Sequence, residues 1–161
     1  MTLKKPFRST IKARLDAALQ MLIVNDRYLL DENLHERTIV HKFATYLQFM
    51  FQSWHVDVEF NKDQLDSKTI HILEHNNPEP HKRSVFPDII VHRRGSNQNL
   101  LIIEAKKSTN SDHESSNYDR QKLACYMQNS GNNNLGYKYG CYIEFITKKP
   151  QVIKPYKIEW I

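Results

Sequence analysis

Two acidic residues and one lysine stand at the ends of two apolar segments that a short polar turn connects. Asp88 begins the first segment, and Glu104 and Lys106 end the second. The turn residues 95–99 (GSNQN) favour a β-hairpin. With a turn centred near Asn97, Asp88 would lie opposite Lys106 and diagonal to Glu104. Because side chains alternate along a strand, all three would share one face of the sheet.

This combination of charges suits hydrolysis of a phosphodiester bond. Carboxylates can hold Mg²⁺, which neutralises phosphoryl oxygens and activates water. A neighbouring lysine can position or deprotonate the water and contact phosphate. A buried ion pair of Lys106 with Asp88 or Glu104 is the alternative, in which the charges only stabilise the fold.

The pattern Pro87-Asp88, fifteen residues, then Glu104-Ala105-Lys106 resembles the signature of the PD-(D/E)XK, or restriction-endonuclease-like, nuclease superfamily. The resemblance spans roughly residues 34–146. It implies that Asp88 and Glu104 ligate Mg²⁺ or Mn²⁺, and that the main-chain carbonyl of Ala105 joins them. Lys106 would be the catalytic base or orient the water. Glu36 would match an acid that the family often places on its first core helix, as a further metal ligand.

The helix that would carry Glu36 is predicted from about Leu34 to Gln52. Asn33 followed by Glu36 has the spacing of a capping box, which makes a helix cap one interpretation of Glu36. The same residue extends an apolar stripe at helical spacing, so its carboxylate would point inward. The stripe consists of Val40, Phe43, Leu47 and Met50. With an inward Glu36, one lysine cannot neutralise all the acids, and the surplus negative charge favours a divalent cation.

Several basic and polar residues are candidates for contact with nucleic acid. The net charge of +5, from 23 basic and 18 acidic residues, favours a polyanionic partner without requiring one. A helix is expected from Ser115 or Ser116 to about Gln128. The family often has a Gln or Lys on this helix, which implies a role for Gln121 and Lys122, although a solvated helix face explains them equally well. Basic residues of and after the hairpin extend the predicted contact surface: Arg93, Arg94 and Lys107.

The remaining pattern predicts a single α/β domain over residues 1–161. A helix is expected at 9–24, a strand at the sheet edge at 54–60, and a short strand or turn at 69–73. Two paired strands, 137–147 and 152–160, follow. The order αα-β-ββ-α-ββ predicts a restriction-endonuclease-like mixed β-sheet core flanked by helices, with residues 1–33 as an N-terminal helical extension and 34–161 as the core.

The resemblance implies a metal-dependent nuclease that hydrolyses DNA phosphodiester bonds, with a homodimer as one arrangement. The alternative is a catalytically inactive restriction-like domain that binds nucleic acid or a protein partner without cleavage. We expect no membrane span, because no apolar run approaches the ~18 residues that a span requires. We also expect no signal peptide, a cytoplasmic location, and reduced Cys125 and Cys141.

Overall fold

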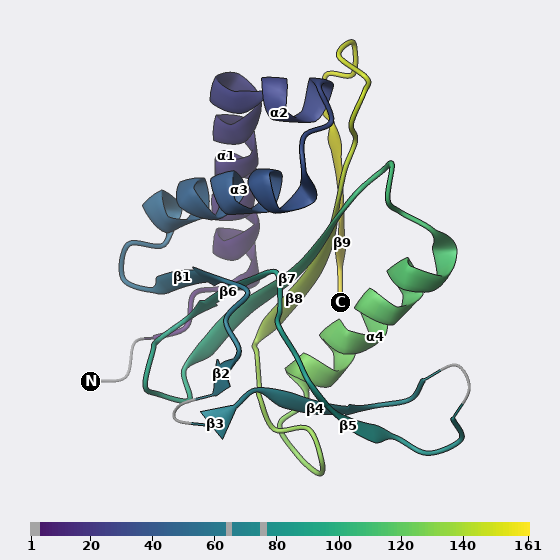
Figure 1. The fold of residues 1–161 in the computed structure, drawn as a ribbon. Coiled ribbons are helices and arrows are strands. Elements are labelled where there is room, and N and C mark those ends of the chain that lie inside the picture. Colours follow the sequence, from purple (N-terminus) through teal and green to yellow (C-terminus); the bar gives the residue numbers. More distant parts are fainter. Residues whose placement is uncertain (1–3, 64–65, 75–76) are drawn as a thin grey trace.

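A computed structural model describes residues 4–63, 66–74 and 77–161, and among them a mixed sheet of five strands lies between helices (Figure 1). The sheet order is β1-β6-β7-β8-β9. β7 pairs antiparallel with β6 and parallel with β8, and β9 pairs antiparallel with β8. The bounds are β1 His55–Val58, β6 Ile89–His92, β7 Asn99–Lys107, β8 Tyr139–Phe145 and β9 Tyr156–Trp160. The predicted α/β class with a helix-flanked mixed sheet is confirmed.

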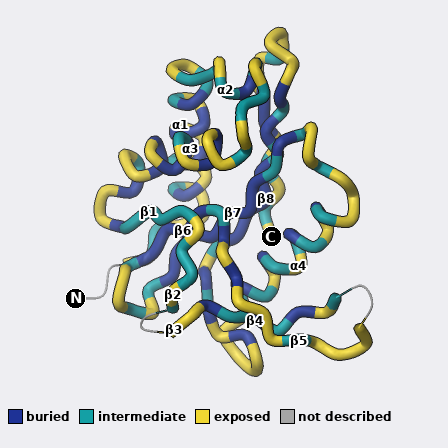
Figure 2. Tube along the Cα trace, in the orientation of Figure 1, coloured by how far each residue is buried: buried dark blue, intermediate teal, exposed yellow. Residues whose placement is uncertain are grey.

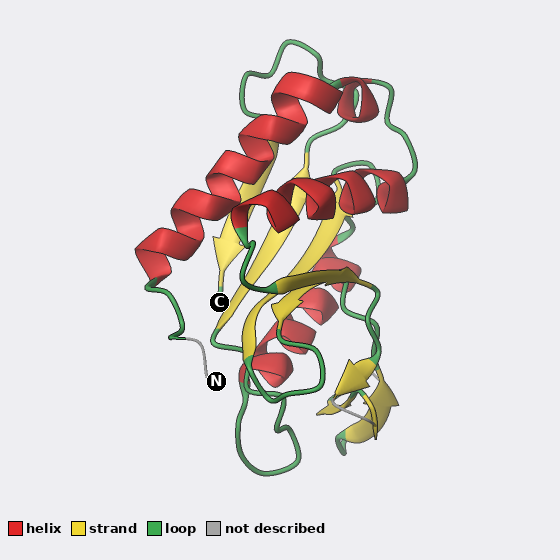
Figure 3. Cartoon of the chain, turned by 90° about the vertical axis from the view of Figure 1, so that its left-hand side faces the viewer, coloured by secondary structure: helices red, strands yellow, loops and turns green. Residues whose placement is uncertain are grey.

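Helices cover both faces of this sheet. Figure 3 shows α1 and α3 crossing its front, with α4 behind it. A hairpin of β4 and β5 lies beside α4, and β2 pairs with β3 separately. The bounds are α1 Arg8–Asp26, α2 Tyr28–Asp31, α3 Glu36–Met50, α4 His113–Met127, β2 Lys62–Asp63, β3 Asp66–Ser67, β4 Thr69–Ile72 and β5 His81–Ser84.

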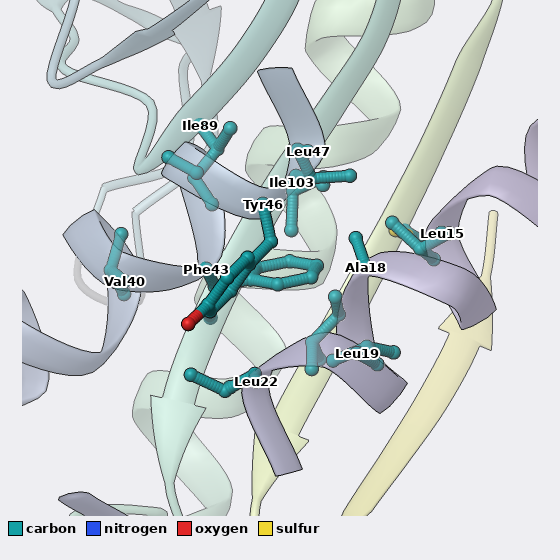
Figure 4. Packing of buried hydrophobic residues seen from close by; sticks show 14 of the residues in the cluster. Leu15, Ala18, Leu19, Leu22, Val40, Phe43, Tyr46, Leu47, Ile89 and Ile103 are labelled. Atoms are coloured by element: carbon teal, nitrogen blue, oxygen red, sulfur yellow. The ribbon is translucent and has the colours of Figure 1, made fainter. Parts of the chain in front are cut away.

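The central strand β7 is buried along nearly its whole length, as Figure 2 shows in dark blue. Alternation sends Ile103 toward α1 and α3, where it packs with Phe43 and Leu15 in one core (Figure 4). Its neighbour Ile102 faces α4 and joins Leu123 in a second core. Burial on both faces explains the unbroken apolar run of this strand.

The predicted hairpin forms, but its register differs by two residues from the expected one. Ile89 pairs with Ile103 and Ile90 with Ile102, and a register irregularity lies between Val91 and His92. Continued by one residue, this register places Asp88 opposite Glu104 rather than Lys106. Because alternation has a period of two, a shift of two leaves all three side chains on one face.

The helix starts differ from the predicted ones. The cap position of α3 is His35, without a side-chain hydrogen bond, and Asn33 lies outside the helix with φ 52°. The predicted Asn33–Glu36 capping box is therefore wrong. Helix α4 is capped by Asp112, which accepts a hydrogen bond from the Ser115 amide at 2.8 Å, rather than by Ser115 or Ser116. Both cysteines are free, as expected.

Candidate active site

Asp88 and Glu36 complete the hydrogen bonding of β7 where it runs past its pairing with β6. The amide of Ala105 donates to Asp88 Oδ2 at 2.8 Å, and the amide of Lys107 donates to Glu36 Oε2 at 2.8 Å. The N–H and C=O of one strand residue point to the same side of the strand. The Ala105 carbonyl therefore faces the same strand edge that Asp88 occupies.

Glu104 is buried beside Asp88 with one oxygen unpaired. Its side chain faces α4, where Lys122 Nζ donates to Glu104 Oε2 at 3.2 Å. Within the described ranges, Glu104 Oε1 accepts no hydrogen bond, although Glu104 is only 2% exposed; the hydroxyl of Tyr126, likewise buried without a partner, lies near Glu104. Burial, and then the charge of Asp88, raise the pKa of Glu104 well above its ordinary value. The negative charge here is incompletely compensated.

The pKa of Asp88 is raised for the same main reason. Burial raises it, and the hydrogen bond from the Ala105 amide and the charge of Lys122 only partly oppose that effect. Two adjacent carboxyl groups whose pKa values are raised mainly by burial are typical of functional sites, where a bound cation would offset the cost of their charges.

Lys106 and Lys122 are held together by a third acid, Asp119 of α4. Lys106 Nζ lies 3.4 Å from Asp119 Oδ2, and Lys122 Nζ lies 2.8 Å from Asp119 Oδ1. Partial burial would lower the pKa of Lys106, but the charges of Asp119 and Glu36 raise it. Burial would also lower the pKa of Lys122, but the charges of Glu104 and Asp119 raise it. Both ammonium groups therefore remain charged near neutral pH.

Asp119 is the site residue that the sequence analysis missed. Its signal was present, because Asp119 falls on the buried stripe of α4 with Ser116, Leu123 and Tyr126. A carboxylate on such a stripe faces the sheet, like the inward acid that the same argument identified at Glu36. Gln121, which was predicted instead, is exposed and lines a separate hollow with Tyr118.

Glu36 lies next to the acid pair and is not a helix cap. Its Oε2 accepts from the Lys107 amide and, at 3.3 Å, from Asn110 Nδ2. Glu36 and Asp88 both line a hollow of about 620 Å³ below α3. The structure therefore places Glu36 at the rim of the site, and its role as a metal ligand stays a prediction.

Three residues predicted to contact nucleic acid lie away from these acids. Lys107 is 7% exposed, and its Nζ donates to the carbonyl of Leu34 at 3.0 Å on the other side of the strand. Arg93 and Arg94 follow the far end of β6, roughly 20 Å from Asp88 at about 3.3 Å per residue. Arg94 pairs with Asp57, and Arg93 donates to a main-chain carbonyl. The side chains of these three residues are outside the candidate site, and only the main-chain amide of Lys107 takes part, through Glu36 at the rim.

Comparisons with protein-family models, with curated proteins and with solved structures found no match. In the described ranges, no helix is both long enough and apolar enough to cross a membrane. The same ranges contain no group of three or more His, Cys, Asp or Glu side chains placed to hold a metal ion. Asp119 already pairs with Lys106 and Lys122. The oxygens that remain to bind a metal ion are those of the Asp88 and Glu104 carboxylates and of the Ala105 carbonyl.

Proposed function

We propose that this chain is a metal-dependent nuclease with a restriction-endonuclease-like core, which hydrolyses DNA phosphodiester bonds. The observation that supports this most directly is the buried, unpaired Oε1 of Glu104 next to Asp88. A buried acceptor without a partner costs about 1–3 kcal/mol, and more when it is charged. A cation between the two carboxylates would remove that cost.

The donor set fits Mg²⁺ or Mn²⁺. Asp88, Glu104 and the Ala105 carbonyl would supply oxygen ligands, which both ions prefer. The charge balance also fits. Asp88, Glu104 and Asp119 carry three negative charges when ionised, against two positive charges on Lys106 and Lys122, which leaves one in excess. A bound ion would neutralise phosphoryl oxygens and lower the pKa of a coordinated water.

The chain's own residues would position the remaining reactants. Lys106, held by Asp119 as a charged ammonium group, would orient the attacking water, and only its deprotonated fraction would take up the proton of that water. Lys122, between Glu104 and Asp119, would present a second ammonium group to the phosphate. Glu36, at the rim, would act through water, because its Oε2 already accepts two hydrogen bonds.

One observation favours a second candidate, an inactive restriction-like domain that binds nucleic acid or a protein partner without cleavage. Lys122 already pairs with Glu104, and Lys106 with Asp119, so each lysine has an acid in this arrangement. In that case the cluster would be a buried ion-pair network that fixes α4 on the sheet.

The test is cleavage of plasmid and of single-stranded DNA by the purified protein in Mg²⁺ or Mn²⁺. Asp88→Ala and Lys106→Ala should abolish cleavage, while Lys157→Ala, which removes a largely exposed lysine of β9, should not. Circular dichroism of each variant controls for folding. DNA binding without nicking by the wild type favours the second candidate, and absence of both DNA and metal binding in calorimetry rejects the nuclease and the nucleic-acid-binding form of the second candidate.

A further inference from the structure

A third hollow, beside the acid cluster of Asp88, Glu104 and Asp119, carries aromatic rings that the proposed cleavage chemistry does not use. It measures about 380 Å³ and lies between α4 and the segment that connects β5 to Asp88. Its wall includes the rings of Phe86 and Tyr118, together with the cations Arg83 and Lys122; Tyr126, which also borders it, is 0% exposed. Rings and positive charge are the two components with which proteins hold single-stranded nucleic acid.

Phe86 is the most accessible of these rings. It is 60% exposed, although the preceding residue, Val85, is buried in the core under α4. Phe86 directly precedes Pro87 and Asp88, so the ring is two residues from a carboxylate of the candidate active site. The flat apolar face of this ring is therefore exposed to solvent next to the candidate active site.

Lys122 contacts both a ring of the hollow, that of Tyr118, and the acid cluster. Tyr118 and Lys122 stand one turn apart on α4, with Lys122 Nζ 5.7 Å from the centroid of the Tyr118 ring. The same Nζ lies 3.2 Å from Glu104 Oε2. A phosphate that meets this ammonium group would therefore lie beside both the rings and the acids.

The cations of the hollow are paired among the described residues. Arg83 lies 2.6 Å from Glu74, and Lys122 pairs with Glu104 and Asp119, so a phosphate can take the place of these acids at Lys122 when a divalent cation binds Glu104. The larger hollow on the outer side of α4 is different, because Glu74, Asp112 and Glu114 line it. A nucleic-acid strand is thus favoured along the Phe86 side of Tyr118.

We propose that this hollow binds an unpaired base of single-stranded DNA, with the adjoining phosphate at Lys122 and the acid cluster. The inference rests on the proposed nuclease function and names its substrate class. Both faces of a base inside a duplex are covered by its stacked neighbours, so a ring in a hollow can contact only a base that has left the stack. Single strands, flaps and frayed ends satisfy this requirement, and an intact duplex does not.

The test is equilibrium binding without cleavage. A fluorescein-labelled oligothymidylate of about 12 nucleotides is titrated with protein in EDTA, and again with Ca²⁺, and anisotropy is compared with that of a blunt duplex of equal length. Phe86→Ala should weaken binding of the single strand at least about five-fold, because stacking on one aromatic ring contributes that much. Phe86→Trp should restore it. Phe49→Ala, which removes a ring that is 56% exposed on α3, is the matched control.

Four results would overturn the inference: no binding of the oligothymidylate in either buffer, equal affinity for the duplex, unchanged binding by Phe86→Ala, or an equal loss in the Phe49 variant. The outcome is separable from that of the nuclease assay. If the protein cleaves DNA and Phe86→Ala binds the single strand as tightly as the wild type, the base-binding proposal fails and the nuclease proposal stands. If the protein never cleaves DNA but Phe86→Ala selectively weakens binding of the single strand, the base-binding proposal stands and the nuclease proposal fails.

Discussion

Replacing Glu104 with Gln should stabilise the protein in the absence of metal. Gln has nearly the same shape and carries no charge, so the negative charge on a residue that is 2% exposed disappears. Lys122 still has an acidic partner after the change, because its Nζ lies 2.8 Å from Asp119 Oδ1. The new amide would stand beside Asp88, which the strand register places opposite residue 104, and could donate to it.

The size of the effect follows from two opposing contributions. Relief of a buried, unpaired carboxylate oxygen is worth about 1–3 kcal/mol. The lost contact with Lys122 subtracts from this gain, but two lysines then balance two carboxylates. We expect a net gain of about 1 kcal/mol in the free energy of unfolding, or roughly 2–4 °C in Tm for a chain of this size.

The gain should depend on pH in a defined direction. The pKa of Glu104 is raised above the ordinary value of 4.5 in the folded state. This group therefore contributes stability that is fully present below pH 4.5 and is lost as the pH rises through the folded pKa. Wild type and Glu104→Gln should be nearly equally stable near pH 4, and the variant should be the more stable at neutral pH.

Urea unfolding in EDTA and in MgCl₂, each at acidic and neutral pH, measures all of these effects. Magnesium should raise the urea midpoint of the wild type at neutral pH and leave that of Glu104→Gln unchanged. Glu159→Gln, which removes a half-exposed carboxylate of β9, should behave like the wild type. A loss of several kcal/mol by Glu104→Gln in EDTA at neutral pH would show that Lys122 fully satisfies Glu104, and that the site has no need of a cation.

Two further predictions concern buried charges. Lys68 is 1% exposed and donates to the Tyr137 hydroxyl at 2.9 Å, and burial lowers the pKa of Lys68 from 10.5 to about 8. Stability should therefore rise from about pH 8 to 10.5, by up to about 3 kcal/mol, and Lys68→Met should lack this rise in urea unfolding curves. An identical pH dependence in the variant would contradict the assignment. Asp119→Asn should lower the pKa of Lys106 by removing the charge beside it, so a limb of the cleavage rate profile that depends on deprotonated Lys106 should shift to lower pH. An unshifted limb would mean that Asp119 does not position Lys106.

The central hairpin was predictable because its signals are local. Alternation along a strand depends only on the backbone, so Asp88, Glu104 and Lys106 share a face even though the register differed by two residues. The same rule places Lys107 on the opposite face from Lys106, where Leu34 covers it. Its assignment to nucleic acid came from counting basic residues rather than from following that rule.

The contribution of α4 was less accessible from sequence. The buried stripe of α4 indicates that Asp119 faces the sheet, but its pairing with two lysines also depends on where α4 lies along the sheet, which local spacing does not fix. Strand β5 was missed for a related reason. Its residues, HKRS, show no apolar alternation, and the strand forms because β4 provides a partner.

The most direct measurement is an anomalous difference map from crystals soaked in Mn²⁺. The proposed function predicts one strong peak between the carboxylates of Asp88 and Glu104, with Lys122 moved off Glu104. A map without a peak at saturating Mn²⁺, with Lys122 still in contact with Glu104, would contradict it.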